Sequence, residues 1–508
     1  MIDPRSTPRP LFVSVGTLAL FAGLAGCGTE QREARPTVME LRPDSPGSTE
    51  LPPRYDATDV VESIVSPGGA FRIHFTRAGR HAVPLTDADA SGTPDHVELV
   101  ARTYDDVLAH YVELGFRAPL TDEAVTDDNG GDGLFDVYLV EFGGGSDGAF
   151  RREICTSDGC AGYMIQENDF AGSHYPSVAY GVRLLASHEL FHAVQAAYDD
   201  ALGAQGSVLS EGTAVWASER YDATLSDVEQ LAYGYTDRTD RSLGVDPATA
   251  GGAYTYGTGI VFEYLGSRYE QAIVRELWED LAVATGDPLW LEVLDARLAS
   301  SHGSSFHDAF VGLAEWMMFL GPRPDPTRGP PNGGAFQPVA AMLVTTPYED
   351  RTVRMFPAAI RYFAVESGTS AVVLGGAGAD EVDVVAVAFD GARFVDRASS
   401  RGGVTLAAAG ADLTLIALVD GRTSGTSRVV SLCLAESGGA CSASTDTDAG
   451  VPLDDAGASD GGAVVAADTG TASPAPSCGC RAGAPARSPL SIAMLGLASL
   501  LVLRRRRA

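Results

Sequence analysis

Lysine is missing from the sequence, and histidine is scarce. The 508 residues include nine histidines, and the 36 basic residues are all arginine. Without lysine the chain can hold no P-loop lysine, no Schiff-base cofactor and no lysine nucleophile. Its 67 acidic residues give a net charge of -31, so the chain has no basic excess that would attract nucleic acid. We therefore expect no nucleic-acid partner. The acidity fits a solvated exterior or bound cations.

Cysteines are also few, and all except Cys27 fall into three close pairs. These pairs are Cys155 with Cys160, Cys433 with Cys441, and Cys478 with Cys480. Such pairs are typical of an exported chain in an oxidising compartment. We predict disulfides in the first two pairs. A zinc site built from these cysteines is disfavoured, because the pairs lie far apart and no C-x-x-C recurs.

The N-terminus has the pattern of an export signal. Arg5 and Arg9 precede the apolar run LFVSVGTLALFAGLAG, which ends at Cys27. The residues Leu24-Ala25-Gly26-Cys27 resemble a bacterial lipoprotein box, in which the cysteine is lipidated and becomes the first residue. A plain secretory signal is the alternative. We predict a signal peptide over residues 1–27, lipidation of Cys27, and an exported protein that is held at the outer membrane or cell surface, or released.

A second membrane-related segment ends the sequence. Residues 478–508 combine SCGC, an apolar stretch from Leu490 to Leu503 and the arginines 504–507. This combination resembles a MYXO-CTERM-type surface-sorting tag. The apolar stretch is shorter than the roughly 20 residues of a comfortable membrane span, so a processed sorting signal fits better than a permanent anchor. The arginine block would stay cytoplasmic and leave the body of the protein outside.

Composition divides the chain between these ends. Residues 28–69 are rich in Pro, Glu, Arg and Ser, which predicts a flexible tether. Residues 70–320 begin with strand patterns such as FDVYLVEF and continue with apolar residues at helical spacing. The Pro/Gly-rich residues 321–345 predict a linker. Short apolar runs between Gly/Asp turns predict a β-sandwich over 346–441, and low complexity predicts disorder over 442–477. The fold class is therefore α+β.

The segment HELFH, residues 188–192, lies inside the apolar run VRLLASHELFHAVQAAYD. On a helix, His188 and His192 share a face, so both imidazoles can reach one metal ion. Glu189 lies about 100° round the helix from His188, close enough to reach a water beside the ion without being a ligand. A half-buried helix with incidental histidines is the weaker interpretation.

A catalytic zinc needs three protein ligands and one open position, and counting along the chain selects Glu211. A metzincin would need glycine and histidine where Gln195 and Tyr198 stand. A thermolysin-like second helix would carry an aspartate where Val215 stands. Residues 193–210 number eighteen, and Glu211 follows. This HExxH-x18-Glu spacing is that of gluzincins of the aminopeptidase-N and leukotriene-hydrolase type.

The residues around Glu211 strengthen this resemblance. Residues 209–214, LSEGTA, are similar to the gluzincin motif Leu-Asn-Glu-Gly-hydrophobic-Ala, with Ser210 in place of asparagine and no tryptophan upstream. The resemblance implies a zincin-like domain with a mixed or antiparallel sheet and a helical subdomain. It also implies a zinc ion bound by His188, His192 and Glu211, with Glu189 as the general base.

The same family places a tyrosine in a Tyr-x-x-Gly motif, where its hydroxyl stabilises the oxyanion. The residues Tyr256-Gly257-Thr258-Gly259 match this motif. The resemblance therefore implies a catalytic role for Tyr256. The neighbouring Tyr254 is a rival, and a tyrosine that merely packs at a helix start is the alternative interpretation.

Residues 162–168, GYMIQEN, resemble the clan's Gly-x-Met-Glu-Asn motif with two additional residues. In aminopeptidases of the clan, the glutamate of this motif binds the free amine of the substrate. We interpret the segment as a substrate-lining edge strand, to which an extended peptide adds by backbone pairing. Tyr163, Met164 and Glu167 would then contact the substrate. An amine clamp is the weaker interpretation, which favours an endopeptidase over an aminopeptidase.

Residues 70–320 as a whole are similar to secreted metalloproteases that carry such C-terminal tags. The shared landmarks are GTPDHVE at Gly92 to Glu98, DVYL at Asp136 to Leu139, and the zinc motif. We therefore predict a zinc metallopeptidase whose partner is a peptide or protein substrate. One alternative is a surface aminopeptidase, which acetylation of the substrate's N-terminus would block. Another is a non-catalytic, calcium-stabilised adhesin, against which the intact Glu189 argues.

Two acidic loops suggest calcium as a second cofactor. Residues 87–98, DADASGTPDHVE, follow EF-hand spacing, although no convincing helix enters the loop. A solvated Asp-rich turn is the alternative, as it is for the looser acidic turn with Asp128, Asp132 and Asp136. The ligands predicted for residues 87–98 are Asp87, Asp89, Ser91, Asp95 and Glu98.

Overall fold

The computed structural model describes residues 42–45, 54–125, 129–143, 147–156, 159–198, 206–244, 253–366, 369–406 and 410–436. The chain divides into two compact units, Met1–Val38 and Met39–Ala508, and every described residue belongs to the second. The predictions for the signal peptide with Cys27, for the segments 442–477 and 478–508, and for Cys441 therefore lie outside the described residues.

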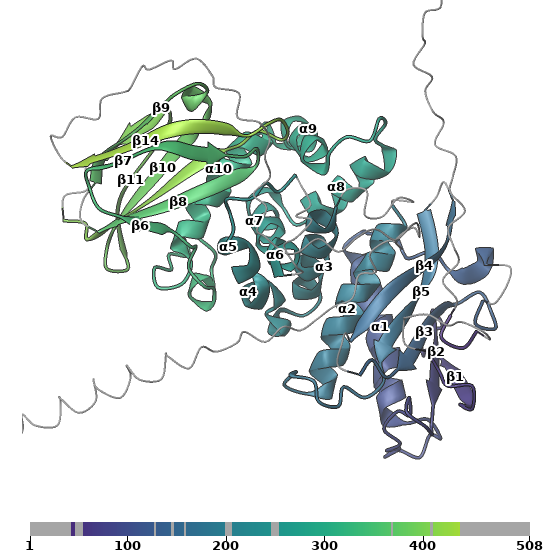
Figure 1. The fold of residues 1–508 in the computed structure, drawn as a ribbon. Coiled ribbons are helices and arrows are strands. Elements are labelled where there is room, and N and C mark those ends of the chain that lie inside the picture. Colours follow the sequence, from purple (N-terminus) through teal and green to yellow (C-terminus); the bar gives the residue numbers. More distant parts are fainter. Residues whose placement is uncertain are drawn as a thin grey trace, which may run out of the picture. The chain divides into compact units, whose positions relative to one another are not determined.

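The first part of the described chain is built on a mixed five-stranded sheet (Figure 1). In spatial order its strands are β1 (Val61–Val65), β2 (Phe71–Thr76), β3 (Phe135–Val140), β5 (Gly159–Glu167) and β4 (Gly148–Thr156). The two outer pairs are antiparallel and the two inner pairs are parallel. β4 therefore lies at an edge of this sheet, next to β5.

Two helices pack against this sheet, α1 (Asp95–Glu113) and α2 (Val178–Ala196). α1 buries an apolar stripe at helical spacing that includes Val97, Val100 and Tyr104. α2 contacts both β4 and β5. Its approach to β4 is close, since a Cβ atom at Gly148 would lie 2.8 Å from the Leu185 side chain. A glycine at this position therefore lets α2 lie directly on the edge strand.

A helical region follows and carries the second half of the zinc motif. α3 contacts α2, α6 and α7, and α8, α9 and α10 continue the packing. These segments have the helical apolar spacing expected from the sequence. The helices are α3 (Ser207–Tyr221), α4 (Asp227–Leu231), α5 (Tyr233–Thr236), α6 (Ala253–Gly257), α7 (Gly259–Tyr269), α8 (Ala272–Val283), α9 (Trp290–His302) and α10 (Phe306–Trp316).

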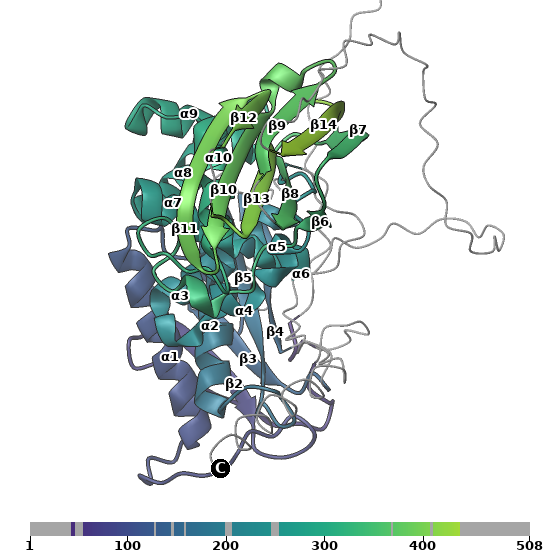
Figure 2. The same ribbon diagram turned by 90° about the vertical axis from the view of Figure 1, so that its left-hand side faces the viewer.

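The last described part is a β-sandwich of two sheets (Figures 1 and 2). One sheet has the order β11-β10-β13-β8-β6 and the other β12-β9-β14-β7, and they share an apolar core. The other face of the first sheet packs on α10, where the Tyr362 hydroxyl donates to the Ala314 carbonyl at 2.8 Å. The strands are β6 (Met342–Val344), β7 (Tyr348–Met355), β8 (Ala359–Glu366), β9 (Thr369–Gly375), β10 (Asp383–Asp390), β11 (Arg393–Arg401), β12 (Gly403–Thr405), β13 (Leu413–Asp420) and β14 (Arg428–Glu436).

The structure is α+β, as predicted, but two predicted boundaries are wrong. The predicted tether over residues 28–69 includes β1, which is paired with β2, and Arg42, which is 1% exposed. The predicted linker over 321–345 is packed as well, since Phe336 and Val339 belong to the apolar core and β6 joins the sandwich. Composition suggested flexibility in both places, whereas strand pairing and burial of a few side chains fix them.

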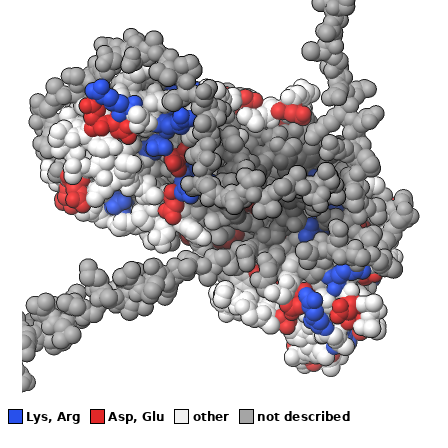
Figure 3. Space-filling model, in the orientation of Figure 1, with Lys and Arg blue, Asp and Glu red and all other residues white. Residues whose placement is uncertain are grey.

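The surface of the described residues carries charges of both signs. On the face in Figure 3, acidic and basic side chains lie next to one another in small groups. Ion pairs among the described residues include Arg72 with Asp132 and Arg397 with Glu315. Among the described helices, none has both the length and the apolarity that crossing a bilayer requires.

Candidate metal centre

The HELFH segment lies in the interior of α2. The helix begins after Ser177, whose hydroxyl accepts a hydrogen bond from the Tyr180 amide at 3.1 Å and so caps the helix. Every residue from Leu185 to Ala196 is buried. A helix that is apolar nearly all round is a central one, and α2 contacts the sheet, α1 and α3. The histidines and the glutamate of the segment are therefore enclosed by protein.

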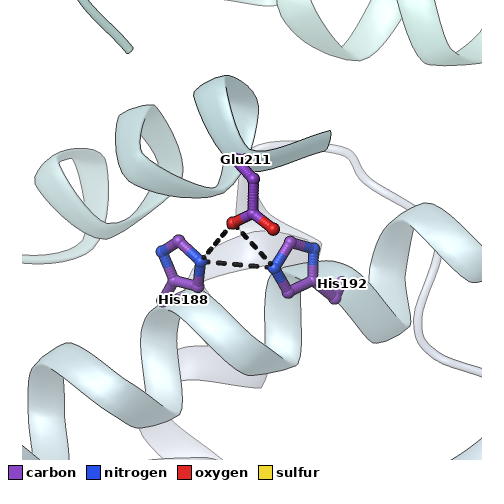
Figure 4. Close-up of side chains that lie close together, drawn as sticks. All are labelled: His188, His192 and Glu211. Atoms are coloured by element: carbon purple, nitrogen blue, oxygen red, sulfur yellow. Dashed lines mark hydrogen bonds and ion pairs between the residues drawn. The ribbon is translucent and has the colours of Figure 1, made fainter. Parts of the chain in front are cut away.

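The structure brings the three predicted ligands together (Figure 4). Glu211 lies on α3, and its Oε2 is 3.1 Å from Nε2 of His188 and 3.5 Å from Nε2 of His192. The two Nε2 atoms are 3.2 Å apart. All three side chains point toward one another from two helices, and each residue is less than 5% exposed.

These separations fit a zinc ion. Tetrahedral zinc with bonds of about 2.0–2.1 Å to nitrogen and oxygen needs ligand atoms about 3.3–3.4 Å apart. The separations of 3.1, 3.2 and 3.5 Å lie on both sides of that value. Two imidazoles and one carboxylate are also a ligand set that zinc uses in catalytic sites. The residues present therefore fit the metal that the sequence predicted.

The electrostatics of the site favour a bound positive charge. Burial lowers the pKa of His192, but the Glu211 carboxylate, together with Glu189 and Gln195, outweighs burial and raises that pKa to about 9. Burial alone would raise the pKa of Glu211, but the imidazoles of His192 and His188 lower it well below its ordinary value. A carboxylate held ionised in the interior is a strong ligand for a cation.

The predicted general base is fixed by the edge strand of the sheet. Oε2 of Glu189 accepts a hydrogen bond from the backbone amide of Phe150 in β4 at 3.0 Å. Glu189 is 1% exposed and adjoins His188 on the same helix. The contact places the carboxylate between the ligand helix and the edge of the sheet.

The structure separates the two candidate tyrosines. The ring of Tyr256 in α6 lies beside His188, with 5.5 Å between ring centroids. The ring of Tyr254 packs on Tyr235 instead, and its hydroxyl is directed to the backbone carbonyls of residues 241 and 242. Of the two tyrosines, Tyr256 is the one that adjoins the metal centre.

The predicted placement of the GYMIQEN segment at an edge is wrong. Residues 162–167 belong to β5, which is paired with β3 on one side and β4 on the other. Tyr163 and Met164 are 0% exposed. The carboxylate of Glu167 accepts a hydrogen bond from the Phe142 amide, and burial raises its pKa to about 7. The edge position belongs to β4, because β5 turns back antiparallel to β4 and also pairs with β3.

The loop of residues 87–98 brings together only part of its predicted calcium ligands. Carboxylate oxygens of Asp87, Asp89 and Asp95 lie within 4.8 Å of one another. The Ser91 hydroxyl donates to Glu98 at 2.7 Å, so these two groups satisfy each other. Calcium binding here stays a prediction.

The looser acidic turn is not a calcium site in its described part. Asp132 is paired with Arg72, and Asp136 is paired with Arg42 and His74. Both described carboxylates of this turn are thus paired with arginine side chains, which favours a turn without calcium. The third residue of the turn, Asp128, lies outside the described residues.

One of the two predicted disulfides is present in full. Cys155 and Cys160 are bonded across the antiparallel pair of β4 and β5. Cys433 is disulfide-bonded as well. Its predicted pairing with Cys441 stays a prediction, because Cys441 lies outside the described residues.

Sequence reasoning missed one residue that contacts the ligands. Gln195, on the last turn of α2, accepts a hydrogen bond from Nδ1 of His192 at 2.9 Å. The signal was available, since residue 195 follows His192 by three positions and therefore lies on the same side of the helix.

Comparison with known proteins gives little to set beside this geometry. No protein-family model matches the chain, and no curated protein matches it. Among matching solved structures is a substrate-bound mutant of an M1 zinc metallopeptidase from Deinococcus radiodurans, with 16% identity and a TM-score of 0.27. The match covers 48% of this chain and spans about half, 49%, of the length of that one. At this TM-score the similarity says nothing about the chemistry of this chain. Any conclusion about function therefore depends on the geometry of the site.

Proposed function

We propose that this protein is a zinc-dependent peptidase that hydrolyses internal bonds of peptides or proteins. The observation that carries the proposal is the convergence of His188, His192 and Glu211 at separations that suit tetrahedral zinc. Zinc bound there would polarise the scissile carbonyl and lower the pKa of water toward neutrality. We also propose that the protein is exported and attached at the outer membrane or cell surface, as residues 1–27 and 478–508 predict.

Glu189 is the proton carrier in this proposal. It lies on α2 next to His188, and its carboxylate accepts a hydrogen bond from the Phe150 amide of β4. From there it would accept a proton from the attacking water and pass it to the leaving amine. Tyr256, whose ring lies beside His188, would donate its hydroxyl proton in a hydrogen bond to the oxyanion.

The edge of β4 supports peptide binding beside these groups. β4 is the last strand of the sheet among the described residues, and an extended peptide can add to such an edge by backbone pairing. The Phe150 amide of β4 donates to Glu189, so a backbone group of this edge strand lies next to the proposed general base. A peptide paired with β4 would therefore run past Glu189.

An endopeptidase is favoured over the aminopeptidase alternative. An aminopeptidase needs a group that binds the free amine of the substrate. The candidate clamp, Glu167, is 5% exposed and hydrogen-bonded to the Phe142 amide. Acetylating the N-terminus of test peptides separates the alternatives, because it abolishes cleavage by an aminopeptidase and leaves cleavage by an endopeptidase unchanged.

The experiment is incubation of the zinc-loaded protein with a mixed peptide library, with products identified by mass spectrometry. The matched variant is Glu189→Gln, which keeps the three ligands and removes the base. We expect internal cuts by the wild type and a rate about 10²–10⁴-fold lower for the variant, the usual contribution of a general base. If the folded, zinc-loaded wild type cuts nothing, the peptidase proposal fails and the non-catalytic adhesin becomes the better account.

A further inference from the structure

Gln195 connects the two helices that carry the metal ligands. Its side chain is 1% exposed. At one end, Oε1 lies 2.9 Å from Nδ1 of His192 on α2. At the other end, Nε2 donates to the Ser210 carbonyl at 2.8 Å and to the Thr213 hydroxyl at 2.9 Å, both on α3. All of the polar atoms of this side chain are thus engaged inside the protein.

The partners on α3 determine which way the amide points. A backbone carbonyl can only accept a hydrogen bond, so the group facing Ser210 has to be the amide nitrogen. The Thr213 hydroxyl donates to the Leu209 carbonyl at 2.8 Å and so presents a lone pair to the same nitrogen. The oxygen of Gln195 therefore faces His192.

The direction of the amide in turn determines the state of His192. Because Oε1 of Gln195 can only accept, Nδ1 of His192 must carry the proton. Nε2 is then the nitrogen that is free to bind a metal, and it is Nε2 that lies 3.2 Å from Nε2 of His188. The chain of contacts from Thr213 and Ser210 through Gln195 thus selects the tautomer that the metal centre requires.

We propose that Gln195 is a positioning residue of the metal centre, which orients His192 and holds α2 in register with α3 next to Glu211. Ser210 directly precedes Glu211, so one amide links the imidazole of one ligand to the backbone beside another. This inference rests on the proposed zinc centre. It adds a residue that acts on the metal only through His192.

The main test is the zinc affinity of Gln195→Met, measured by competition with a chromophoric chelator. Methionine keeps the length of the side chain and removes the acceptor and both donors. We expect an affinity about 10–100-fold lower than that of the wild type, the usual cost of losing a partner of a metal-bound histidine. An affinity within about twofold of the wild type overturns the proposal.

A second variant separates positioning from mere packing. Gln195→Glu keeps an oxygen that can accept from His192 but disturbs the contacts with α3. If the acceptor matters, Gln195→Glu recovers most of the zinc affinity lost in Gln195→Met, even where its thermal stability is lower. Equal losses of zinc affinity in both variants would mean that residue 195 acts only through the fold, which overturns the proposal.

Two hydroxyls on α3 provide a matched pair. Thr213→Val removes the hydroxyl that accepts from Gln195, whereas Ser218→Ala removes an equally buried hydroxyl that donates to the Ala214 carbonyl and does not contact Gln195. We expect Thr213→Val, and not Ser218→Ala, to lower the zinc affinity. A wild type that binds no zinc would instead refute the proposed function, so the two failures are distinguishable.

Discussion

Two clusters of buried carboxylates differ in the positive groups that surround them. At the metal centre, the partners of Glu211 are the imidazoles of His188 and His192. In the second cluster, Asp122, Asp136 and Glu153 surround the guanidinium of Arg42, and all four are less than 5% exposed.

The difference lies in the source of the cation. In the Arg42 cluster the chain supplies it, since Arg42 donates to both oxygens of Glu153 at 2.6 Å and to Asp122 at 2.7 Å. At the metal centre the groups are arranged as ligands around a common point, with their nitrogen and oxygen atoms at the spacing of a metal's coordination shell. An arginine thus neutralises the buried carboxylates in one place, and a bound metal ion could do so in the other.

The largest effect on stability is expected from removing the cation of the Arg42 cluster. Arg42→Met leaves three buried carboxylates without their cation, which costs about 3–5 kcal/mol of unfolding free energy. Urea denaturation followed by circular dichroism measures it. The control is Arg297→Met, which removes a partner of Asp280 from a pair that is 24% and 29% exposed, and which should cost about 0–1 kcal/mol. Similar small losses in both variants would contradict the account.

Two tyrosine variants test the candidate metal centre. Tyr256→Phe removes the hydroxyl from the ring that lies beside His188 and should lower kcat about 10²–10³-fold if that hydroxyl donates to the oxyanion. Tyr254→Phe is the matched control, because its ring packs on Tyr235 away from the centre, and kcat should be unchanged. Steady-state kinetics on one cleaved peptide measures both variants. Equal effects would show that Tyr256 has only a packing role.

The pH dependence of stability gives a smaller effect from the Arg42 cluster. Burial raises the pKa of Asp122 to about 7 and that of Asp136 to about 6, although Arg42 opposes the shift. Between about pH 4, the ordinary value for an unfolded chain, and pH 7, the folded state holds more protons than the unfolded state. This contribution is therefore complete below about pH 4 and is lost as the pH rises through 7.

The variant Asp122→Asn isolates that contribution. It keeps an acceptor for Arg42 and removes the titrating group, so unfolding free energies measured from pH 4 to 8 should fall less steeply than in the wild type. A wild type and variant with parallel profiles would show that Asp122 does not titrate in this range.

The metal centre could be predicted from the sequence because its geometry is mostly local. His188, Glu189 and His192 lie on one helix, where spacing alone decides which side chains share a face. Glu211 followed from the resemblance to gluzincins, in which the third ligand stands at a fixed distance after the second histidine. The disulfide of Cys155 and Cys160 is local in the same way, since it joins two antiparallel strands that follow one another in the chain.

The features that could not be predicted from the sequence depend on contacts between distant segments. Which strand lies at the edge is decided by the pairing of β5 with β3 and β4, and no pattern within GYMIQEN specifies it. The partners of Arg42 lie 80, 94 and 111 residues away, so the composition of residues 28–69 gave no sign that one arginine is buried. Helical spacing predicts that Gln195 lies near His192. Its role could not be predicted, because that role depends on the positions of Ser210 and Thr213 on α3.

The most direct test of the central claim is zinc content after equilibrium dialysis, measured by plasma mass spectrometry on the folded protein. We predict one zinc ion per chain in the wild type and in Glu189→Gln, and zinc at background level in His188→Ala and Glu211→Ala. A wild type without zinc, or a His188→Ala variant that retains one tightly bound ion per chain, would contradict the assignment of these residues as the metal centre.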